Sequence, residues 1–141
     1  MITTTPPCLN DFKLLRLDFA LNPRFASATG QAQIQTEFKI RHELQPPHLR
    51  VYLTIAFNDA DGPFRLQAEG LGLFDLPAQR RDAELEQLVN EHCALVLFPY
   101  LRELVADITR RAGFPPLHIP HVDFARVFAH RSREAASQLL H

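Results

Sequence analysis

The stretch Leu97–Phe124, LFPYLRELVADITRRAGFPPLHIPHVDF, decides the fold of this chain. Pro99 lies inside an otherwise helical run, where it removes a backbone donor and clashes with the preceding turn. The run ends at Ala112-Gly113 and two prolines follow; glycine suits the left-handed position that ends a helix, and proline cannot continue one. Asp123 then stands where its side chain can cap a second helix. The pattern predicts two helices joined by a proline-rich connector, with no sign of an active site.

The helical pattern extends upstream of this stretch to Asp82. Apolar residues recur there at steps of three and four, the spacing of a helix face that packs against a core. They form two stripes: Leu85, Leu88, Val89 and His92, then Leu97, Leu101, Leu104, Val105 and Ile108. We expect one long helix over residues 82–112, kinked or broken between Ala94 and Pro99. The second helix is expected to run from Asp123 to about Leu140.

Upstream of residue 82 the hydrophobic period is two, which is typical of strands. Four runs have strand character: residues 12–21, 33–43, 49–58 and 64–76. Turn residues between Asp59 and Pro63 separate the last two runs. This order predicts an α+β fold, a four-stranded antiparallel meander followed by two helices, the first long and broken near Pro99. At 141 residues, the chain is expected to form a single domain over 1–141.

The faces of these strands can be assigned from the alternation. The third run places Leu49, Val51, Leu53, Ile55 and Phe57 inward and Arg50, Tyr52, Thr54 and Asn58 outward. In the first run Leu15, Leu17, Phe19 and Leu21 share one face, with Phe12 and Leu14 on the other. A strand that is apolar on both faces is either deeply covered or bulged. In the fourth run Gly70 and Gly72 share a face, and their bare backbone lets another element come close.

Composition excludes several classes of function. A net charge of −1, with both signs mixed, provides no concentrated basic surface, so no nucleic-acid partner is expected. No apolar run reaches the roughly 18 residues of a membrane span, and the N-terminus lacks the pattern of a secretory signal. We therefore expect a cytoplasmic protein with no membrane insertion. Cys8 and Cys93 lie far apart and form no CxxC pair, so two reduced thiols are expected.

No group of polar residues indicates catalysis. His118, His121 and Asp123 come nearest to a metal-ligand cluster, but they lie in a proline-rich connector that would not fix their geometry. His92 beside Cys93 is expected to be partly buried within a helix. Asp59 and Asp61 resemble the start of a calcium loop without its required pattern. Phosphate-loop, dinucleotide and nucleophile-elbow motifs are absent from the sequence. No enzyme activity, cofactor or metal is expected.

Assembly is indicated by Leu95–Phe98, LVLF, which is apolar at four consecutive positions. On a helix these side chains point in all directions, and a single four-stranded sheet covers only one side. We therefore expect the long helix to lie between layers from different subunits, in an obligate oligomer. The alternative is that the second helix and the N-terminal segment cover it within a monomer.

The chain resembles the SecB family of export chaperones from about Phe12 to Phe128. The resemblance is specific in two places: FRLQAEGLGLF over Phe64–Phe74, similar to the fourth strand of the family, and LFPYLRELVADITRRAGFPPLHIPHVDFARVF over Leu97–Phe128. It implies a homotetramer built as a dimer of dimers, with paired sheets forming eight-stranded layers and the long helices between them. It also implies an ATP-independent holdase that binds unfolded polypeptide clients along apolar grooves.

Two departures from the family pattern concern the docking of SecA, the translocation ATPase. Classical members present an acidic outer sheet face, and the matching positions here are Arg16, Ala20, Arg65 and Gln67. Classical members also carry a flexible tail after the last helix, whereas this sequence ends at His141. The resemblance leaves docking to SecA open, and these departures argue against it. They fit the branch of SecB-like chaperones that hold an antitoxin, and equally a divergent chaperone of exported preproteins.

Six apolar residues near the sheet–helix groove are the candidate client contacts: Phe38, Ile40, Leu53, Phe74, Leu76 and Phe128. Ordinary core packing is the alternative role for each of them. Phe98, Pro99, Tyr100 and Leu101 are expected to be structural, at the broken helix and its interface. The competing functions are a small-molecule-binding or catalytic α+β domain that uses the glycine-lined sheet face, and a purely structural adaptor.

Overall fold

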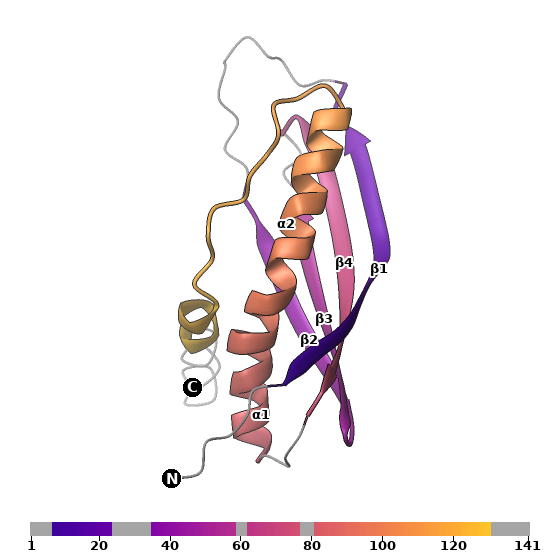
Figure 1. The fold of residues 1–141 in the computed structure, drawn as a ribbon. Helices are drawn as coiled ribbons and strands as arrows, with labels where there is room; N and C mark the ends of the chain where they lie inside the picture. Colours follow the sequence, from indigo (N-terminus) through magenta and orange to yellow (C-terminus); the bar gives the residue numbers. More distant parts are fainter. Residues whose placement is uncertain (1–6, 24–34, 59–61, 77–80, 131–141) are drawn as a thin grey trace.

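The computed structural model describes residues 7–23, 35–58, 62–76 and 81–130. The strands are β1 (Cys8–Leu21), β2 (Glu37–Gln45), β3 (His48–Phe57) and β4 (Phe64–Asp75). They form one antiparallel sheet, and a long helical span lies across one of its faces (Figure 1). A connector then runs back along the helical span to a short helix at residues 124–130. The α+β fold with four strands before two helices is confirmed.

The strand order is β1-β4-β3-β2. Strands β2, β3 and β4 follow one another as the predicted meander, but β1 pairs with β4 and not with β2. The meander prediction is therefore wrong for the first strand. Three hairpin-connected strands and one strand that reaches the far side by a long connection form a Greek key. Periodicity assigns the faces of a strand but not its neighbours, so the sequence could not distinguish the two orders.

Strand β1 is bulged, which was one of the two predicted alternatives. Its pairing with β4 shifts between Leu14 and Arg16, leaving Leu15 as the extra residue. Because one inserted residue reverses the alternation that follows, Phe12 and Leu14 lie on the same face as Leu17. The predicted division of this strand between two faces is wrong for that reason. A second shift lies between Leu9 and Asp11.

Strand β3 is buried on both faces. The inward residues are fully buried as expected, but Tyr52 and Thr54, predicted to face water, are also buried. They are covered by neighbours on the outer face: the Arg41 guanidinium carbon lies 3.7 Å from the centre of the Tyr52 ring, and the Thr54 hydroxyl donates to Glu69 at 3.0 Å. A central strand is flanked on both sides, which alternation alone does not reveal.

The long helical span has three parts: α1 (Asp82–Leu88), a π-helical turn η2 (Val89–Cys93) and α2 (Ala94–Arg111). Pro99 lies inside α2, and the irregular turn precedes the predicted interval between Ala94 and Pro99. Residues at steps of four are buried all along the span: Leu85, Val89, Cys93, Leu97, Leu101, Val105 and Thr109. Four residues rotate an α-helix by about 400°, which is about 40° more than one full turn. The π turn has more residues per turn, so it brings the later buried residues partly back into line with the earlier ones.

Both predicted helix ends are confirmed. Gly113 has a φ of 95°, its N–H donates to Arg110 O and the Phe114 N–H to Thr109 O, each at 3.1 Å. This pair of bonds is a Schellman motif. At the second helix, Asp123 Oδ1 accepts from the Arg126 N–H at 3.2 Å, so Asp123 is the N-cap. The expected extension to Leu140, the strand start at residues 33 and 34, and the hairpin tip at residues 59–61 lie outside the described residues.

The core fills the space between the sheet and the helical span. Other side chains come close to the bare backbone of both glycines, as predicted: a Cβ on Gly72 would lie 2.5 Å from a methyl of Leu97 on α2. A Cβ on Gly70 would lie 2.5 Å from the Phe12 ring. Within the described residues, no helix is long and apolar enough to cross a membrane.

Candidate functional site

Three phenylalanines from three elements meet at the β2 edge of the sheet. Phe38 of β2, Phe98 of α2 and Phe124 of the short helix form an aromatic cluster, with ring centroids 5.6–6.0 Å apart and edge-on geometry. Phe98 and Phe124 are buried, while Phe38 is half-buried. Edge-to-face ring pairs are favourable beyond the area they bury, so the aromatic cluster holds the short helix against the sheet edge.

The structure brings three of the candidate client contacts together beside this cluster. Ile40 lies opposite Leu53 in the β2–β3 register, two residues along β2 from Phe38. Phe128 lies one helical turn after Phe124 and is half-buried. Phe38, Ile40 and Phe128 are partly open to solvent, whereas Leu53, beside Ile40 on the neighbouring strand, is fully buried.

The other two candidate contacts lie elsewhere on the same sheet face. Phe74 is buried opposite Leu49, near the end of β4. Leu76 follows that strand, and its N–H donates to Pro47 O at 2.8 Å beside the β2–β3 turn. Both side chains belong to the core cluster, so a client would reach them only if they became exposed.

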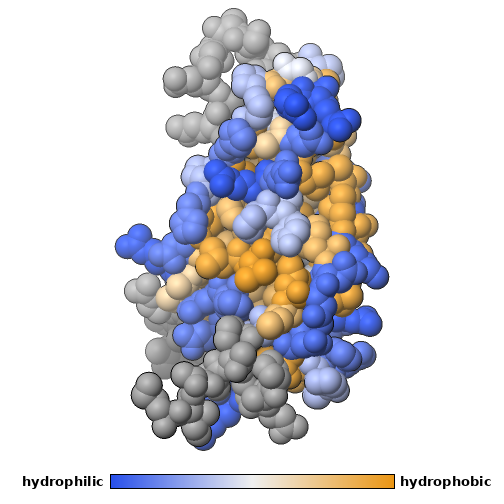
Figure 2. All heavy atoms as spheres, in the orientation of Figure 1, coloured by the Kyte–Doolittle hydropathy of each residue, from blue (hydrophilic) through white to orange (hydrophobic). Residues whose placement is uncertain are grey.

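A hollow of about 270 Å³ adjoins the aromatic cluster. His92 and Leu95 form one wall, and His121 and Phe124 form the other. It lies where the irregular π turn faces the start of the short helix. Leu95, the first residue of the LVLF segment, is 45% exposed, so this part of the helical span presents apolar surface. Figure 2 shows apolar atoms gathered over the helical span and toward β1.

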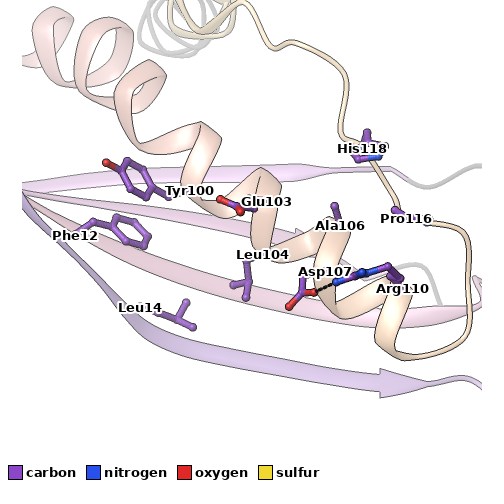
Figure 3. Close-up of a pocket in the computed structure, with 10 residues that line it drawn as sticks. All are labelled: Phe12, Leu14, Tyr100, Glu103, Leu104, Ala106, Asp107, Arg110, Pro116 and His118. Carbon is purple, nitrogen blue, oxygen red and sulfur yellow. Dashed lines mark hydrogen bonds and ion pairs between the residues drawn. The ribbon is translucent and has the colours of Figure 1, made fainter.

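A larger hollow of about 600 Å³ lies between β1 and α2 (Figure 3). Phe12, Leu14, Tyr100 and Leu104 line its apolar part, and the Phe12 and Tyr100 rings stack with centroids 4.6 Å apart. Leu14 and Tyr100 are both exposed. The sequence predicted Tyr100 only as a residue of the broken helix; its stacking on Phe12 depends on the β1 bulge and could not be foreseen.

The rim of this hollow is charged. Asp107 accepts from Arg110 at 2.6 Å and from Arg111 at 3.0 Å. These two hydrogen bonds lower the pKa of the Asp107 carboxyl below its ordinary value. Arg110 and Arg111 also place positive charges near the C-terminal end of α2, where the helix dipole favours them.

A buried hydroxyl outside the predicted site residues ties the connector to α2. The Thr109 hydroxyl donates to Val105 O at 2.8 Å and accepts from the Leu117 N–H at 2.9 Å. Thr109 is fully buried. The sequence carried one signal for this contact: Thr109 is a polar residue in line with the apolar stripe of the helix, and a buried polar group needs hydrogen-bond partners.

The structure does not bring the histidines of the connector together. His118 lines the larger hollow and His121 the smaller one. Within the described residues, no three histidine, cysteine or acidic side chains converge as metal ligands. Cys93 is buried and Cys8 is exposed, and they are not joined to each other. The glycine-lined face needed for the small-molecule alternative is filled by Phe12 and Leu97.

The four candidate docking residues gather on the outer face of the sheet, opposite the helices. Ala20 pairs with Arg65 in the β1–β4 register, Asp18 with Gln67, and Arg16 with Glu69. Arg16 forms an ion pair with Asp18 on its own strand. This outer face carries both signs of charge.

Comparison with known proteins identifies the family. The family model described as preprotein translocase subunit SecB matches residues 15–135. Because this match covers most of the chain, the chain belongs to the SecB family.

Named relatives agree with this assignment. The chain is 37% identical over 78 residues to the protein-export protein SecB of Paraburkholderia phymatum, covering 53% of this chain and 47% of that protein. It is 37% identical over 75 residues to the protein of the same name from Burkholderia vietnamiensis, covering 53% and 46%. The match thus spans about half the length of these curated relatives.

Solved structures share the fold. The SecB-like chaperone of Mycobacterium tuberculosis, in complex with a ChAD peptide from the HigA1 antitoxin, matches with a TM-score of 0.72 at 22% identity, covering 83% of this chain and 91% of that one. A Streptococcus agalactiae protein of unknown function matches with a TM-score of 0.55 at 11% identity, covering 82% and 97%.

Proposed function

We propose that this protein is an ATP-independent holdase that binds unfolded or non-native polypeptide and catalyses no reaction. Membership of the SecB family over residues 15–135 carries the proposal. Exposed apolar surface captures apolar segments of a non-native chain. Binding the unfolded state opposes its folding by mass action, and several weak sites on one assembly add avidity along a long client.

The proposed client surface is the β2 edge with the aromatic cluster. Phe38, Ile40 and Phe128 are its partly exposed members, and Leu53, Phe74 and Leu76 extend it into the core if it opens. Apolar side chains from β2 and the short helix lie close enough to contact one extended segment.

The proposed assembly is a homotetramer, a dimer of dimers with eight-stranded layers and the helical spans between them. Strand β1 is an edge strand, and Leu15 and Leu21 on it are 47% and 53% exposed. An apolar, unpaired edge favours pairing with another chain. On the helical span, Leu95 and Tyr100 remain exposed although the short helix covers Phe98. Within one chain, the short helix therefore leaves part of the apolar surface of the helical span uncovered.

Two client classes are compatible with this function in the cytoplasm. The curated relatives are named for protein export, and the similar M. tuberculosis chaperone holds an antitoxin peptide. We propose that the client is either a preprotein or a dedicated protein such as an antitoxin. Co-purification of the chain with candidate antitoxins or with SecA, followed by the stoichiometry of any soluble complex, separates the two.

The test of the holdase activity is suppression of aggregation of a chemically unfolded protein, without nucleotide. We expect light scattering to fall as the chaperone approaches one assembly per client. Scattering that is unchanged at a large excess of chaperone contradicts the proposal. A second measurement concerns SecA docking. If R65E with Q67E creates SecA binding, the absence of acidic residues at these two positions accounts for the loss of docking. Tight SecA binding by the unaltered protein contradicts that explanation.

A further inference from the structure

The outer face of the sheet carries a small hollow on the side away from the helices and the client surface. It has a volume of about 320 Å³ and is bordered by Asp18, Ala20, Asn58, Arg65 and Gln67. These residues come from β1, the end of β3 and the start of β4. The hollow is separate from the aromatic cluster, which lies on the opposite face at the β2 edge.

Asp18 is the acidic side chain that borders the same hollow, and Arg65 is exposed. Its cross-strand partner on β1 is Ala20, and on the other side the β3 register ends with Phe57 opposite Leu66, which leaves Asn58 beside Arg65. Among the described residues, no ion pair includes Arg65, whereas Arg16 is paired with Asp18 and Arg41 with Glu43 and Glu69. With respect to the described part of the chain, the Arg65 guanidinium therefore makes no ion pair that a ligand would have to displace.

The frame around Arg65 is held in place by the β1–β4 ladder. At its end the Asn22 N–H donates to Pro63 O at 2.9 Å, and the Asn22 side-chain amide donates to Gly62 O at 2.8 Å. These bonds tie the last residues of β1 to the chain that enters β4. A binding group on a rigid element loses less freedom when a ligand arrives.

We propose that this hollow docks a carboxylate-bearing, acidic segment of a protein partner. A guanidinium binds a carboxylate through two parallel hydrogen bonds, and the amides of Asn58 and Gln67 are further donors at its border. The Asp18 carboxylate is engaged by Arg16, which reduces its repulsion of an incoming acid. A nucleic acid would require a concentrated basic surface, and the outer face lacks one.

The inference is independent of the holdase function, because the two surfaces lie on opposite faces of the sheet. The test is a titration of the ¹⁵N-labelled full chain with acetyl-tetraglutamate amide, followed by backbone amide shifts. We expect saturable shifts confined to Ala20, Asn58, Arg65 and Gln67. Added salt should weaken them, since exposed charges are screened.

Variants and comparison ligands make the outcome decisive. R65E should abolish the saturable shifts, and R65Q, which keeps a polar side chain of similar reach, should weaken binding about tenfold or more through loss of a charge-assisted pair. R102E, at an exposed arginine of α2, is the matched control and should leave binding unchanged. Acetyl-tetralysine amide should produce no shifts at these positions.

Three results would overturn the proposal: no saturable shift with the acidic peptide, equal binding by R65Q, or the same shifts with inorganic phosphate at equal concentration. The last would mean that the hollow takes any small anion. Aggregation suppression by R65E should equal that of the unaltered chain, so failure of this inference and failure of the holdase function are distinguishable.

Discussion

Gly72 lies directly under Leu97: a Cβ at Gly72 would stand 2.5 Å from Leu97 Cδ2 and 2.7 Å from the Phe74 ring. This contact sets the distance between β4 and α2, because both Leu97 and Phe74 are buried and have little room to move. Leu97 can therefore pack in the core only because Gly72 has no side chain.

We predict that Gly72→Ala destabilises the fold by about 1–3 kcal/mol through overpacking. Gly113→Ala is a useful comparison, because nothing lies within 4 Å of its Cβ and only its positive φ opposes the change; we expect about 1 kcal/mol there. Denaturant unfolding at one fixed protein concentration measures both, since stability of an oligomer depends on concentration. A neutral Gly72→Ala would show that Leu97 can withdraw without loss.

Thr109→Val should loosen the connector. The substitution preserves shape but removes the hydroxyl that accepts from the part-buried Leu117 N–H, and loss of such a hydrogen bond costs about 1 kcal/mol. Hydrogen exchange should be faster at Leu117 than in the unaltered protein. Thr109→Ser keeps the hydroxyl and should retain the protection; equal protection in Thr109→Val would contradict the role of this bond.

Ile40→Ser should weaken aggregation suppression. Ile40 is a half-buried member of the proposed client surface, and losing its apolar side chain reduces the area available to a client. Lys39→Ser, on the outward face of the same strand, is the control and should suppress aggregation as the unaltered chain does. Circular dichroism and the midpoint of thermal unfolding verify that both variants remain folded. Equal activity of the two variants would place client binding elsewhere.

Leu15→Lys should reduce the mass of the assembly. Leu15 is the exposed bulge residue of edge strand β1, and a charge there opposes edge pairing. Leu44→Lys places the same charge on the other edge strand, where Leu44 is 40% exposed, and should leave the mass unchanged. Sedimentation at micromolar concentration measures both. An unaltered protein with the mass of one chain would refute the assembly itself.

Asp107 should titrate below its ordinary pKa of 3.8, because the Arg110 and Arg111 side chains donate to its charged form. A carboxyl whose pKa is lowered by folding stabilises the fold above its unfolded-state pKa, and this contribution is lost as pH falls through the lowered value. A ¹³C NMR titration of the carboxyl measures the pKa directly. Arg110→Ala should raise it, and Arg102→Ala should leave it unchanged; a normal pKa in the unaltered protein contradicts the hydrogen bonding.

Local features of this protein could be predicted from the sequence alone. The helix stop at Gly113, the cap at Asp123 and the alternation of β2 depend on neighbouring residues and on backbone preferences that act within a few positions. The close approach at Gly70 and Gly72 and the choice between a covered and a bulged β1 were also visible in the residue pattern. These features carried enough information to indicate the SecB family.

Tertiary structure decided what depends on partners distant in the chain. The place of β1 beside β4, the burial of Tyr52 on a central strand, and the meeting of Phe38 with Phe98 and Phe124 all join segments that the sequence separates. The same holds for the π turn, whose position follows from packing a repeat of four residues against a sheet. The hydrophobic periodicity of a segment indicates which way each of its side chains points. Which distant segment packs against it depends on the free energy of the whole packed arrangement.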